Sequence, residues 1–405
     1  MTVDLDALRA SPNALAPHYS RFGVAERLLL TGHSHQAWPD VAADGQLAAF
    51  EDAARLVDAK WDAAFAKADL VRAGLRRLLD DPDAELALGA NTHELVIRFL
   101  SALDLAARPR LVTTDGEFHT LRRQLARLAE AGIEVVRVPA VPVDTLAERM
   151  AASVDGRTAA VLVSAVLFET SRIVPGLGEL ATMCHRHGTE LLVDAYHALG
   201  VTPVSVSGQG LADAWLVGGG YKYLQLGEGN CFLRLPEHAR QLRPVITGWY
   251  AEFGELAGSV GAESVGYGPG AIRFAGATYD PTSHYRAASV FDFFERADLS
   301  VPLLRQVSQH QTGLLAERFD AIDAPAELVT RDRDTPRSAF AGFLALRSPY
   351  ADRLRAALAD RGVLTDSRGE YLRFGPAPYL SDGQLSDAMA ALGEIIAAGL
   401  DHTGR

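Results

Sequence analysis

Two short polar segments, each following an apolar run, carry the residues best suited to chemistry. The first is Asp194-Ala-Tyr-His197 and the second is Gly220-Tyr-Lys222-Tyr. A buried lysine loses its proton readily and can bind an aldehyde covalently. A carboxylate placed against a pyridine nitrogen keeps that nitrogen protonated, so that the ring accepts electrons from a substrate. The pair Asp194 and Lys222 therefore predicts a catalytic site for pyridoxal 5'-phosphate (PLP), with His197 close enough to reach the phenolic oxygen of the same ring.

Each of these residues also has an ordinary structural interpretation. Aspartate is favoured as a helix N-cap or turn residue, and a lone histidine is most often a buried residue with satisfied hydrogen bonds. Most lysines are solvated surface charges, but Lys222 comes after Gly218-Gly-Gly220 and before Gly227-Glu-Gly229. Glycines let a backbone approach a flat cofactor, although the same turn could be no more than a tight connection.

Four further residues could hold the rest of the cofactor. Asn91, Thr92 and His93 stand at an expected helix start, where backbone N–H groups and the helix dipole favour a phosphate. Phe118 follows a strand-like run and could stack on an aromatic ring. Helix capping and core packing explain the same four residues, so both interpretations stay open.

Arg373 lies far from these residues in the sequence, in the segment Tyr371-Leu-Arg-Phe-Gly-Pro-Ala-Pro-Tyr379. An arginine on a strand could bind a substrate carboxylate with two parallel hydrogen bonds. A surface ion pair is the alternative.

The elements that must position these residues suggest an α/β fold with a mostly parallel sheet covered by helices. Continuous apolar runs that read as strands cover residues 110–114, 133–138, 159–164, 190–194 and 214–218. Segments long enough for crossover helices lie between them, at residues 120–131, 143–152 and 177–187. Ligands of such sheets bind at the carboxyl ends of the strands, where Asp194 and Lys222 fall.

The chain is expected to divide into three parts. Residues 1–40 form an N-terminal segment near the site, residues 41–280 a large PLP-binding domain that starts with one helix over 41–79, and residues 281–405 a smaller α+β domain. A Gly- and Pro-rich passage marks the second boundary. Beyond it the pattern predicts a helical region over 284–321, strands at 342–346 and 371–374, and helices that begin at 351 and 382.

Composition favours a cytoplasmic enzyme or binding protein with a small-molecule substrate. The 405 residues are 48% hydrophobic and carry a formal net charge of −12, which argues against a nucleic-acid surface. Two cysteines are too few for a disulfide scaffold or a structural zinc site, so no metal is expected. The N-terminus does not read as a secretory signal, and no apolar run approaches the roughly 20 residues of a membrane span.

The motifs together resemble the class V aminotransferase family of fold-type-I PLP enzymes, and within it the kynureninases. The strongest match is Asp194-Ala-Tyr-His-Ala-Leu-Gly200 with Tyr221-Lys-Tyr-Leu224. Weaker matches are Val163 to Pro175, where Ser171 replaces a family glycine, Glu117-Phe-His-Thr120, Gly248-Trp-Tyr250, and Arg373 with Pro376, Pro378 and Tyr379.

The resemblance implies that Lys222 binds the cofactor covalently, that Asp194 pairs with its ring nitrogen, and that Phe118 stacks on the ring beside His197. It also implies that Arg373 binds the α-carboxylate of an amino acid substrate and that the protein is a homodimer with shared active sites. The phosphate contacts that it implies are Thr92, Tyr221, Trp249 and Thr278, the last two from the partner subunit.

The sequence departs from the kynureninase pattern where that pattern contacts its substrate. Leu121 replaces an aspartate, and residues 51–61 lack a clear counterpart of the histidine segment that helps to hold the kynurenine ring. The early loop reads Gly32-His-Ser-His35, so His33 and His35 either contact a different substrate or are surface histidines.

The resemblance favours kynureninase-like hydrolysis of a β–γ carbon bond to alanine and an acid. Class V aminotransferase, lyase or racemase chemistry on another amino acid is the alternative. Cysteine desulfurase chemistry is disfavoured because Cys184 and Cys231 fall in a predicted helix and a predicted strand. A PLP-binding regulator or a nucleotide-binding doubly wound protein is also disfavoured, since the chain shows neither a helix-turn-helix module nor a Gly-x-Gly-x-x-Gly after the first strand.

Overall fold

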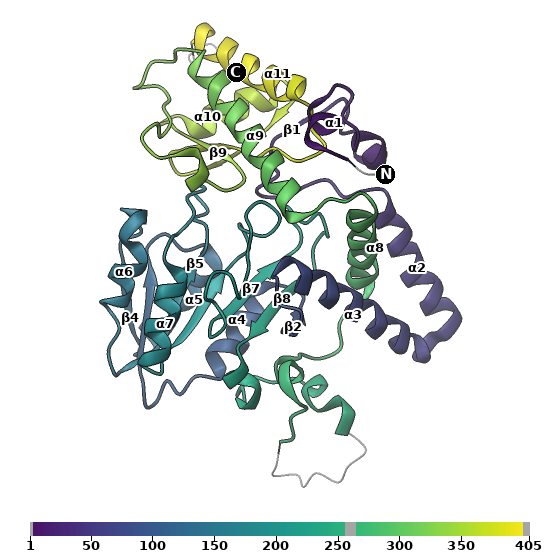
Figure 1. Cartoon of the computed structure of the whole chain (residues 1–405), viewed down its shortest axis with the longest axis vertical. Coiled ribbons are helices and arrows are strands. Elements are labelled where there is room, and N and C mark those ends of the chain that lie inside the picture. The colour runs from purple at the N-terminus through teal and green to yellow at the C-terminus, as the bar shows by residue number, and fades with distance from the viewer. Residues whose placement is uncertain (1–2, 256–264, 400–405) are drawn as a thin grey trace.

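A seven-stranded sheet forms the centre of the larger part of the protein (Figure 1). The computed structural model describes residues 3–255 and 265–399. The strand order is β2-β8-β7-β6-β5-β3-β4, in which β7, β6, β5, β3 and β4 are parallel and β8 runs antiparallel to both β7 and β2. The strands are β2 (Glu85–Gly89), β3 (Arg110–Thr114), β4 (Glu134–Val138), β5 (Thr158–Ser164), β6 (Glu190–Asp194), β7 (Trp215–Gly219) and β8 (Cys231–Leu235). The mostly parallel sheet predicted from the sequence is confirmed.

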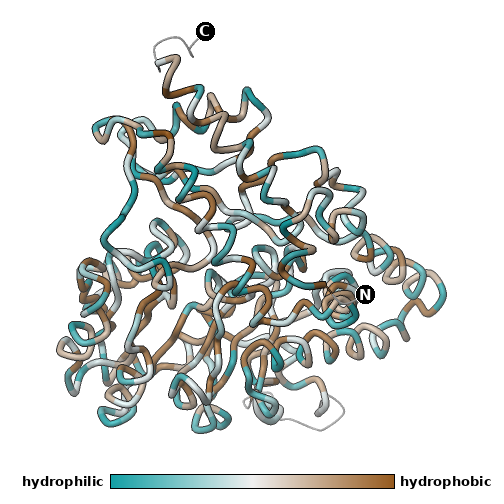
Figure 2. Tube along the Cα trace, turned by 45° about the horizontal axis from the view of Figure 1, so that its top comes forward, coloured by the Kyte–Doolittle hydropathy of each residue, from teal (hydrophilic) through white to brown (hydrophobic). Residues whose placement is uncertain are grey.

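Both faces of this sheet are buried, which explains why its strands are apolar without alternation. All seven residues of β5 are buried, with Ala160 and Leu162 on one face and Val161 and Val163 on the other. Helices α4 (Thr92–Ser101) and α5 (His119–Glu130) cover the first face, while α6 (Leu146–Ala151) and α7 (Leu177–Arg186) cover the second. Figure 2 shows the resulting concentration of hydrophobic segments inside the molecule.

The single helix expected over residues 41–79 is instead two helices, α2 (Val41–Leu56) and α3 (Lys60–Leu78), joined by the short helix η2 (Val57–Ala59). Both pack on α8 (Thr282–Arg296). A Cβ on Gly45 would lie 2.7 Å from an α8 carbonyl oxygen, and one on Gly74 would lie 2.6 Å from the Phe291 ring. A straight helix would separate the two glycines by about 43 Å, so the chain must turn back to reach α8 with both. Val57 makes this turn with a φ of 53°.

The C-terminal part is a smaller α+β unit, as predicted. An antiparallel sheet of β11 (Asp366–Arg368), β12 (Tyr371–Phe374) and β9 (Leu344–Arg347) packs with α9 (Val301–Asp320), α10 (Ala351–Ala359) and α11 (Asp382–Ala398). The N-terminal strand β1 (Leu28–Leu29) pairs in parallel with β10 (Val363–Leu364), so that the first residues join this unit (Figure 1). The domain boundaries at residues 40 and 280 stay a prediction.

Short helices complete the described chain. They are α1 (Leu5–Arg9), η1 (Ala16–Phe22), η3 (Val143–Thr145), η4 (Glu237–Gln241), η5 (Trp249–Glu255), η6 (Gly270–Phe274) and η7 (Arg337–Ala339). Across residues 3–255 and 265–399, no helix is long and apolar enough to cross a membrane. The same residues contain no group of three or more His, Cys, Asp or Glu side chains placed to hold a metal ion.

Candidate active site

The candidate site lies at the carboxyl edge of the sheet, where β6 and β7 end side by side. Asp194 is the last residue of β6 and stands level with Ser164 of β5 and Val217 of β7. Lys222 is the third residue after the end of β7. Because these strands are parallel, their carboxyl ends share one edge, which brings the predicted acid and the predicted lysine together.

Lys222 is buried, with 6% of its surface exposed. Its Nζ lies 2.7 Å from Nε2 of His197 in a hydrogen bond. The same nitrogen is 4.6 Å from the ring centre of Tyr196, 5.3 Å from that of Phe118 and 5.7 Å from that of Tyr221. Burial lowers the pKa of Lys222 to about 7, although the nearby Asp194 works in the opposite direction. A large fraction of this amine is therefore neutral near pH 7 and able to act as a nucleophile.

Asp194 and His197 are held in place around this amine. Asp194 accepts a hydrogen bond from the backbone N–H of Tyr196 at 2.9 Å, and burial raises the pKa of its carboxyl group. Burial and the nearby Lys222 lower the pKa of His197 well below its ordinary value, so His197 is neutral. Its Nδ1 is buried and has no hydrogen-bond partner among the described residues. The site thus offers one free ring nitrogen, which suits a ligand that carries hydrogen-bonding groups.

The predicted phosphate donors stand at the start of α4, two strands away from Lys222. Asn91 caps this helix, because its side chain accepts a hydrogen bond from the N–H of Glu94. Gly89 of β2 is level with Cys231 of β8, which is level with Gly219 of β7, so the α4 N-terminus and the lysine turn share one edge. Asn91 and His93 are exposed and Thr92 is partly exposed. The capping interpretation of Asn91 is correct, and the first turn of α4 remains accessible to an anion.

Trp249 and Thr278 lie in the segment between β8 and α8, outside the sheet that carries Asp194 and the lysine turn. Trp249 opens η5 and is 45% exposed, and Thr278 is exposed. Their contribution to the site of a neighbouring subunit stays a prediction.

Arg373 does not reach the surface, contrary to the alternative interpretation of a surface ion pair. It is 3% exposed, and its guanidinium donates 2.6 Å hydrogen bonds to the carboxylate of Asp366 and to the backbone carbonyl of Phe168. Its Nε is buried without a partner among the described residues. Asp366 stands directly opposite Arg373 across the β11–β12 pair. The carboxylate-binding residue predicted from the sequence therefore already carries a resident carboxylate.

The two histidines of the early loop have different environments. His33 is fully buried against the ring of Phe343, at 4.7 Å between ring centres, so it is not a surface histidine. His35 is exposed and stacks on Tyr221, at 4.8 Å and 22° between the rings. His35 lies beside the lysine turn, whereas His33 is buried next to Asp366 and Arg373.

Two residues around the candidate site were not predicted to have a role. Tyr196 lies inside the Asp194–His197 motif, and its ring is the nearest to the Lys222 amine of the three named above. Glu117 precedes Phe118 and accepts hydrogen bonds from Thr114 Oγ1 at 2.7 Å and from Ser164 Oγ at 2.6 Å. Burial raises the pKa of Glu117 to about 7. Glu117 anchors the Phe118 loop to β5, and a glutamate three residues after the end of a predicted strand was the available signal.

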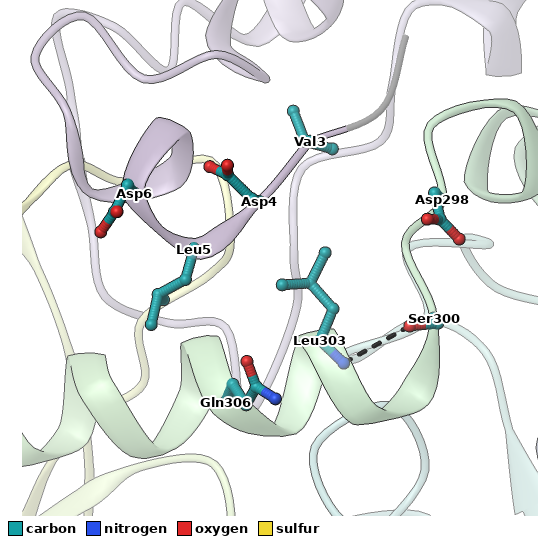
Figure 3. Close-up of a pocket in the computed structure, with 8 residues that line it drawn as sticks. All are labelled: Val3, Asp4, Leu5, Asp6, Asp298, Ser300, Leu303 and Gln306. Atoms are coloured by element: carbon teal, nitrogen blue, oxygen red, sulfur yellow. Dashed lines mark hydrogen bonds between the residues drawn. The ribbon is translucent and has the colours of Figure 1, made fainter.

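A separate surface hollow of about 510 Å³ lies between the N-terminal segment and the start of α9 (Figure 3). Its lining includes Asp4, Asp6 and Asp298 and none of the residues around Lys222. It plays no part in the site described above.

Comparison with known proteins supports the same architecture, although no family model matches the chain. The isopenicillin N epimerase of Streptomyces clavuligerus is 28% identical over 345 residues, which cover 79% of this chain and 83% of that protein. The uncharacterized aminotransferase YcbU of Bacillus subtilis (strain 168) is 23% identical over 330 residues, which cover 81% of this chain and 84% of that protein.

Solved structures of C-DES have a similar fold. A C-DES mutant with glycine covalently linked to its PLP cofactor matches with a TM-score of 0.81 at 17% identity, over 94% of this chain and 99% of the other. The cystine C–S lyase C-DES with its reaction product cysteine persulfide matches with a TM-score of 0.77, also at 17% identity, over 92% of this chain and 99% of the other. The chain therefore has the same fold as these PLP-dependent enzymes.

Proposed function

We propose that the protein is a PLP-dependent enzyme that acts on an amino acid by aminotransferase or lyase chemistry. The observation that carries the proposal is the buried Lys222 amine, hydrogen-bonded to His197 beside Asp194 at the carboxyl edge of the sheet. The shared fold and the curated relatives support it.

The residues present fit this cofactor. The aldehyde of the cofactor would bind Lys222, and its ring nitrogen would pair with Asp194. Its phenolic oxygen would lie near the unpartnered Nδ1 of His197. When bound, PLP withdraws electrons from the α-carbon of an amino acid. Phe118 and Tyr196 supply ring contacts, and Lys222 is placed to remove and return the α-proton.

The phosphate end of the cofactor would meet a small set of polar groups. They are Asn91, Thr92 and His93 at the start of α4, Tyr221 beside the lysine, and Trp249 and Thr278 from a second copy of the chain. Backbone N–H groups in the first turn of a helix favour an anion without a charged side chain.

Aminotransferase or lyase chemistry is better supported than the kynureninase-type hydrolysis expected from the motifs. The two curated relatives are an epimerase and an aminotransferase, and C-DES is a C–S lyase. Hydrolysis of a β–γ carbon bond rests on the sequence motifs alone, and it stays the competing proposal.

Cysteine desulfurase chemistry remains disfavoured. Cys184 is buried in α7 and Cys231 is buried in β8, and burial raises the pKa of each thiol to about 12. A thiol that acts as a nucleophile must be accessible and must ionise near neutral pH. Neither of the two cysteines in the chain meets these conditions.

A substrate panel tests the proposal directly. We expect the cofactor-loaded protein to convert at least one amino acid, with either a keto acid that forms only when 2-oxoglutarate accepts the amine, or a product cleaved at the β-carbon. Mass spectrometry of the products separates the two reactions. Release of alanine from kynurenine or 3-hydroxykynurenine would instead establish the hydrolase.

Arg373→Lys is expected to raise the KM for the amino acid by about 10- to 100-fold, because a lysine keeps the charge but loses the two-pronged hydrogen bond to a carboxylate. Steady-state kinetics on the substrate found in the panel measure the effect. Arg361→Lys is the matched control, since Arg361 lies beyond α10 and donates to the backbone carbonyl of Ala357. An unchanged KM in Arg373→Lys would remove Arg373 from the substrate site.

A homodimer with shared sites is part of the proposal. Helix α2 exposes Leu47 and Phe50, η2 exposes Val57, and η5 exposes Trp249 and Phe253. Large exposed apolar side chains in such groups are typical of contact surfaces.

We expect light scattering to give about twice the chain mass of 43.4 kDa, and Phe50→Asp to shift the protein toward the monomer because it buries a charge at the contact. Val141→Asp is the matched control, because Val141 is 73% exposed, close to the 71% of Phe50, and follows the edge strand β4 instead of lying on α2. A monomer in both the unmodified protein and the control would reject the shared site.

A further inference from the structure

Arg373, Asp366 and His33 form a buried charged cluster next to the candidate site. Arg373 donates to Oδ2 of Asp366 at 2.6 Å, and Nε2 of His33 lies 3.6 Å from the same oxygen. That separation is too long for a hydrogen bond. Both ring nitrogens of His33 are buried and have no hydrogen-bond partner among the described residues. A fully buried imidazole with two unpartnered nitrogens is rare and requires an explanation.

The resting cluster is electrically balanced. Arg373 is positive and Asp366 is negative, since burial alone would raise the pKa of Asp366 but His33, Arg373 and Arg368 hold it below its usual range. Burial lowers the pKa of His33 to about 4; Asp366 opposes this effect, and Arg373 and Lys222 add to it. His33 is therefore neutral near pH 7, and the net charge of the three groups is zero.

A second carboxylate cannot enter this cluster without compensation. A substrate carboxylate at Arg373 would leave two negative groups against one buried arginine. Arg368, the next cation along β11, is 3.5 Å from Asp366, but its side chain is 44% exposed and screened by solvent. Like charges placed together in a buried site repel each other strongly, so the cluster must gain a positive charge.

We propose that His33 takes up one proton from solvent when a substrate carboxylate binds at Arg373. The inference rests on the proposed role of Arg373 in the previous subsection. The proton adds to a ring nitrogen of His33, which then donates to Asp366 or to the incoming carboxylate, and the cluster returns to neutrality. His33 is thus a residue that determines specificity for a carboxylate, because a neutral group at the same place draws no proton.

The groups around His33 leave it as the proton acceptor. Asp366 faces it from β11, Arg373 from β12, and Lys222 and His197 from the sheet edge. Arg368 lies beside Asp366 on β11. Both arginines are already protonated. Lys222 and His197 bond to each other, and bound PLP would occupy both. Asp366 keeps its charge because it pairs with Arg373.

The sign of the pH dependence follows from this assignment. Above pH 4, the approximate pKa of His33 in the free protein, binding of a carboxylate must draw a proton from solution. Carboxylate binding therefore weakens by about tenfold for each unit of rising pH, until the pKa of His33 in the complex is passed. Above that pH the affinity becomes constant.

Propionate tests the inference without turnover, because it has a carboxylate but no amine to react with the cofactor. Calorimetry on the cofactor-loaded protein between about pH 5 and about pH 8 gives its dissociation constant and, in two buffers of different ionisation enthalpy, the protons taken up. We expect uptake of close to one proton per bound propionate, and an affinity for propionate that falls about tenfold for each unit of rising pH. Propionamide is the neutral control and is expected to draw none.

Two variants separate the proton acceptor from the charge that it balances. His33→Gln is expected to bind propionate weakly with no pH slope, because glutamine cannot be protonated. Asp366→Asn removes the resident carboxylate, so it is expected to bind about tenfold more tightly near pH 8, also without a slope. A merely structural role of Asp366 would weaken binding instead. His185→Gln is the matched control, since His185 is exposed at the same 3.6 Å from Asp213.

The outcomes distinguish this inference from the proposed function. Propionate binding with no proton uptake in the unmodified protein overturns the role of His33 and leaves Arg373 in place. Uptake that persists in His33→Gln also overturns it. Absence of propionate binding at every pH overturns the carboxylate role of Arg373 and the inference with it.

Discussion

Lys222→Ala is expected to abolish the visible absorbance of the covalently bound cofactor and to lower turnover by at least about 10³-fold. The reason is that Lys222 supplies both the nucleophile for the cofactor aldehyde and the base for the α-proton, and a positioned base alone contributes about 10² to 10⁴ in rate. Its amine is buried, and burial lowers its pKa to about 7. Absorbance spectra and steady-state kinetics measure the two losses.

The composition of the chain makes the covalent assignment unusually easy to check. Lysine occurs three times, at Lys60, Lys67 and Lys222, while every other basic side chain apart from the histidines is arginine. Borohydride reduction followed by peptide mass mapping is expected to place the cofactor on Lys222. Lys60→Ala and Lys67→Ala, both on α3, are the controls and should keep the absorbance. A labelled peptide at either of these positions, or an unchanged band in Lys222→Ala, would reject the site.

The large sheet could be predicted because its signal is local. Each central strand is a short apolar run, and Asp194 and Lys222 directly follow two of them, so chain order alone placed both at the same edge. The break between α2 and α3 could not be predicted in this way. It depends on the packing of Gly45 and Gly74 against α8, more than 200 residues further along the chain.

The contacts of Arg373 also show how far local sequence patterns can predict the site. Asp366 is close in sequence and faces Arg373 across a tight hairpin that turns at Gly369, where φ is 52°. A hairpin interpretation of this segment would have paired the two residues. His33 reaches Asp366 only because β1 joins the C-terminal unit, and no local pattern carries that information.

Asp194→Asn is expected to lower turnover by about 10²-fold or more while the cofactor stays bound to Lys222. Asparagine has the same shape and can still accept the hydrogen bond from the Tyr196 N–H, so the end of β6 should keep its conformation. What the variant loses is the negative charge that keeps the ring nitrogen of the cofactor protonated. Losses of about 10² to 10³ are typical when one preorganised electrostatic contact is removed from a site.

The matched control for this variant is Asp115→Asn. Asp115 also follows a strand at the same edge of the sheet and accepts a backbone hydrogen bond, from Ala140 at 2.7 Å, but it is exposed. If charge at this edge acted only through fold stability, both variants would lower turnover together with the melting temperature. We expect Asp115→Asn to keep its turnover and Asp194→Asn to lose it at an unchanged melting temperature. Equal turnover in the two variants would mean that Asp194 is only a structural turn residue. Another group would then keep the ring nitrogen of the cofactor protonated.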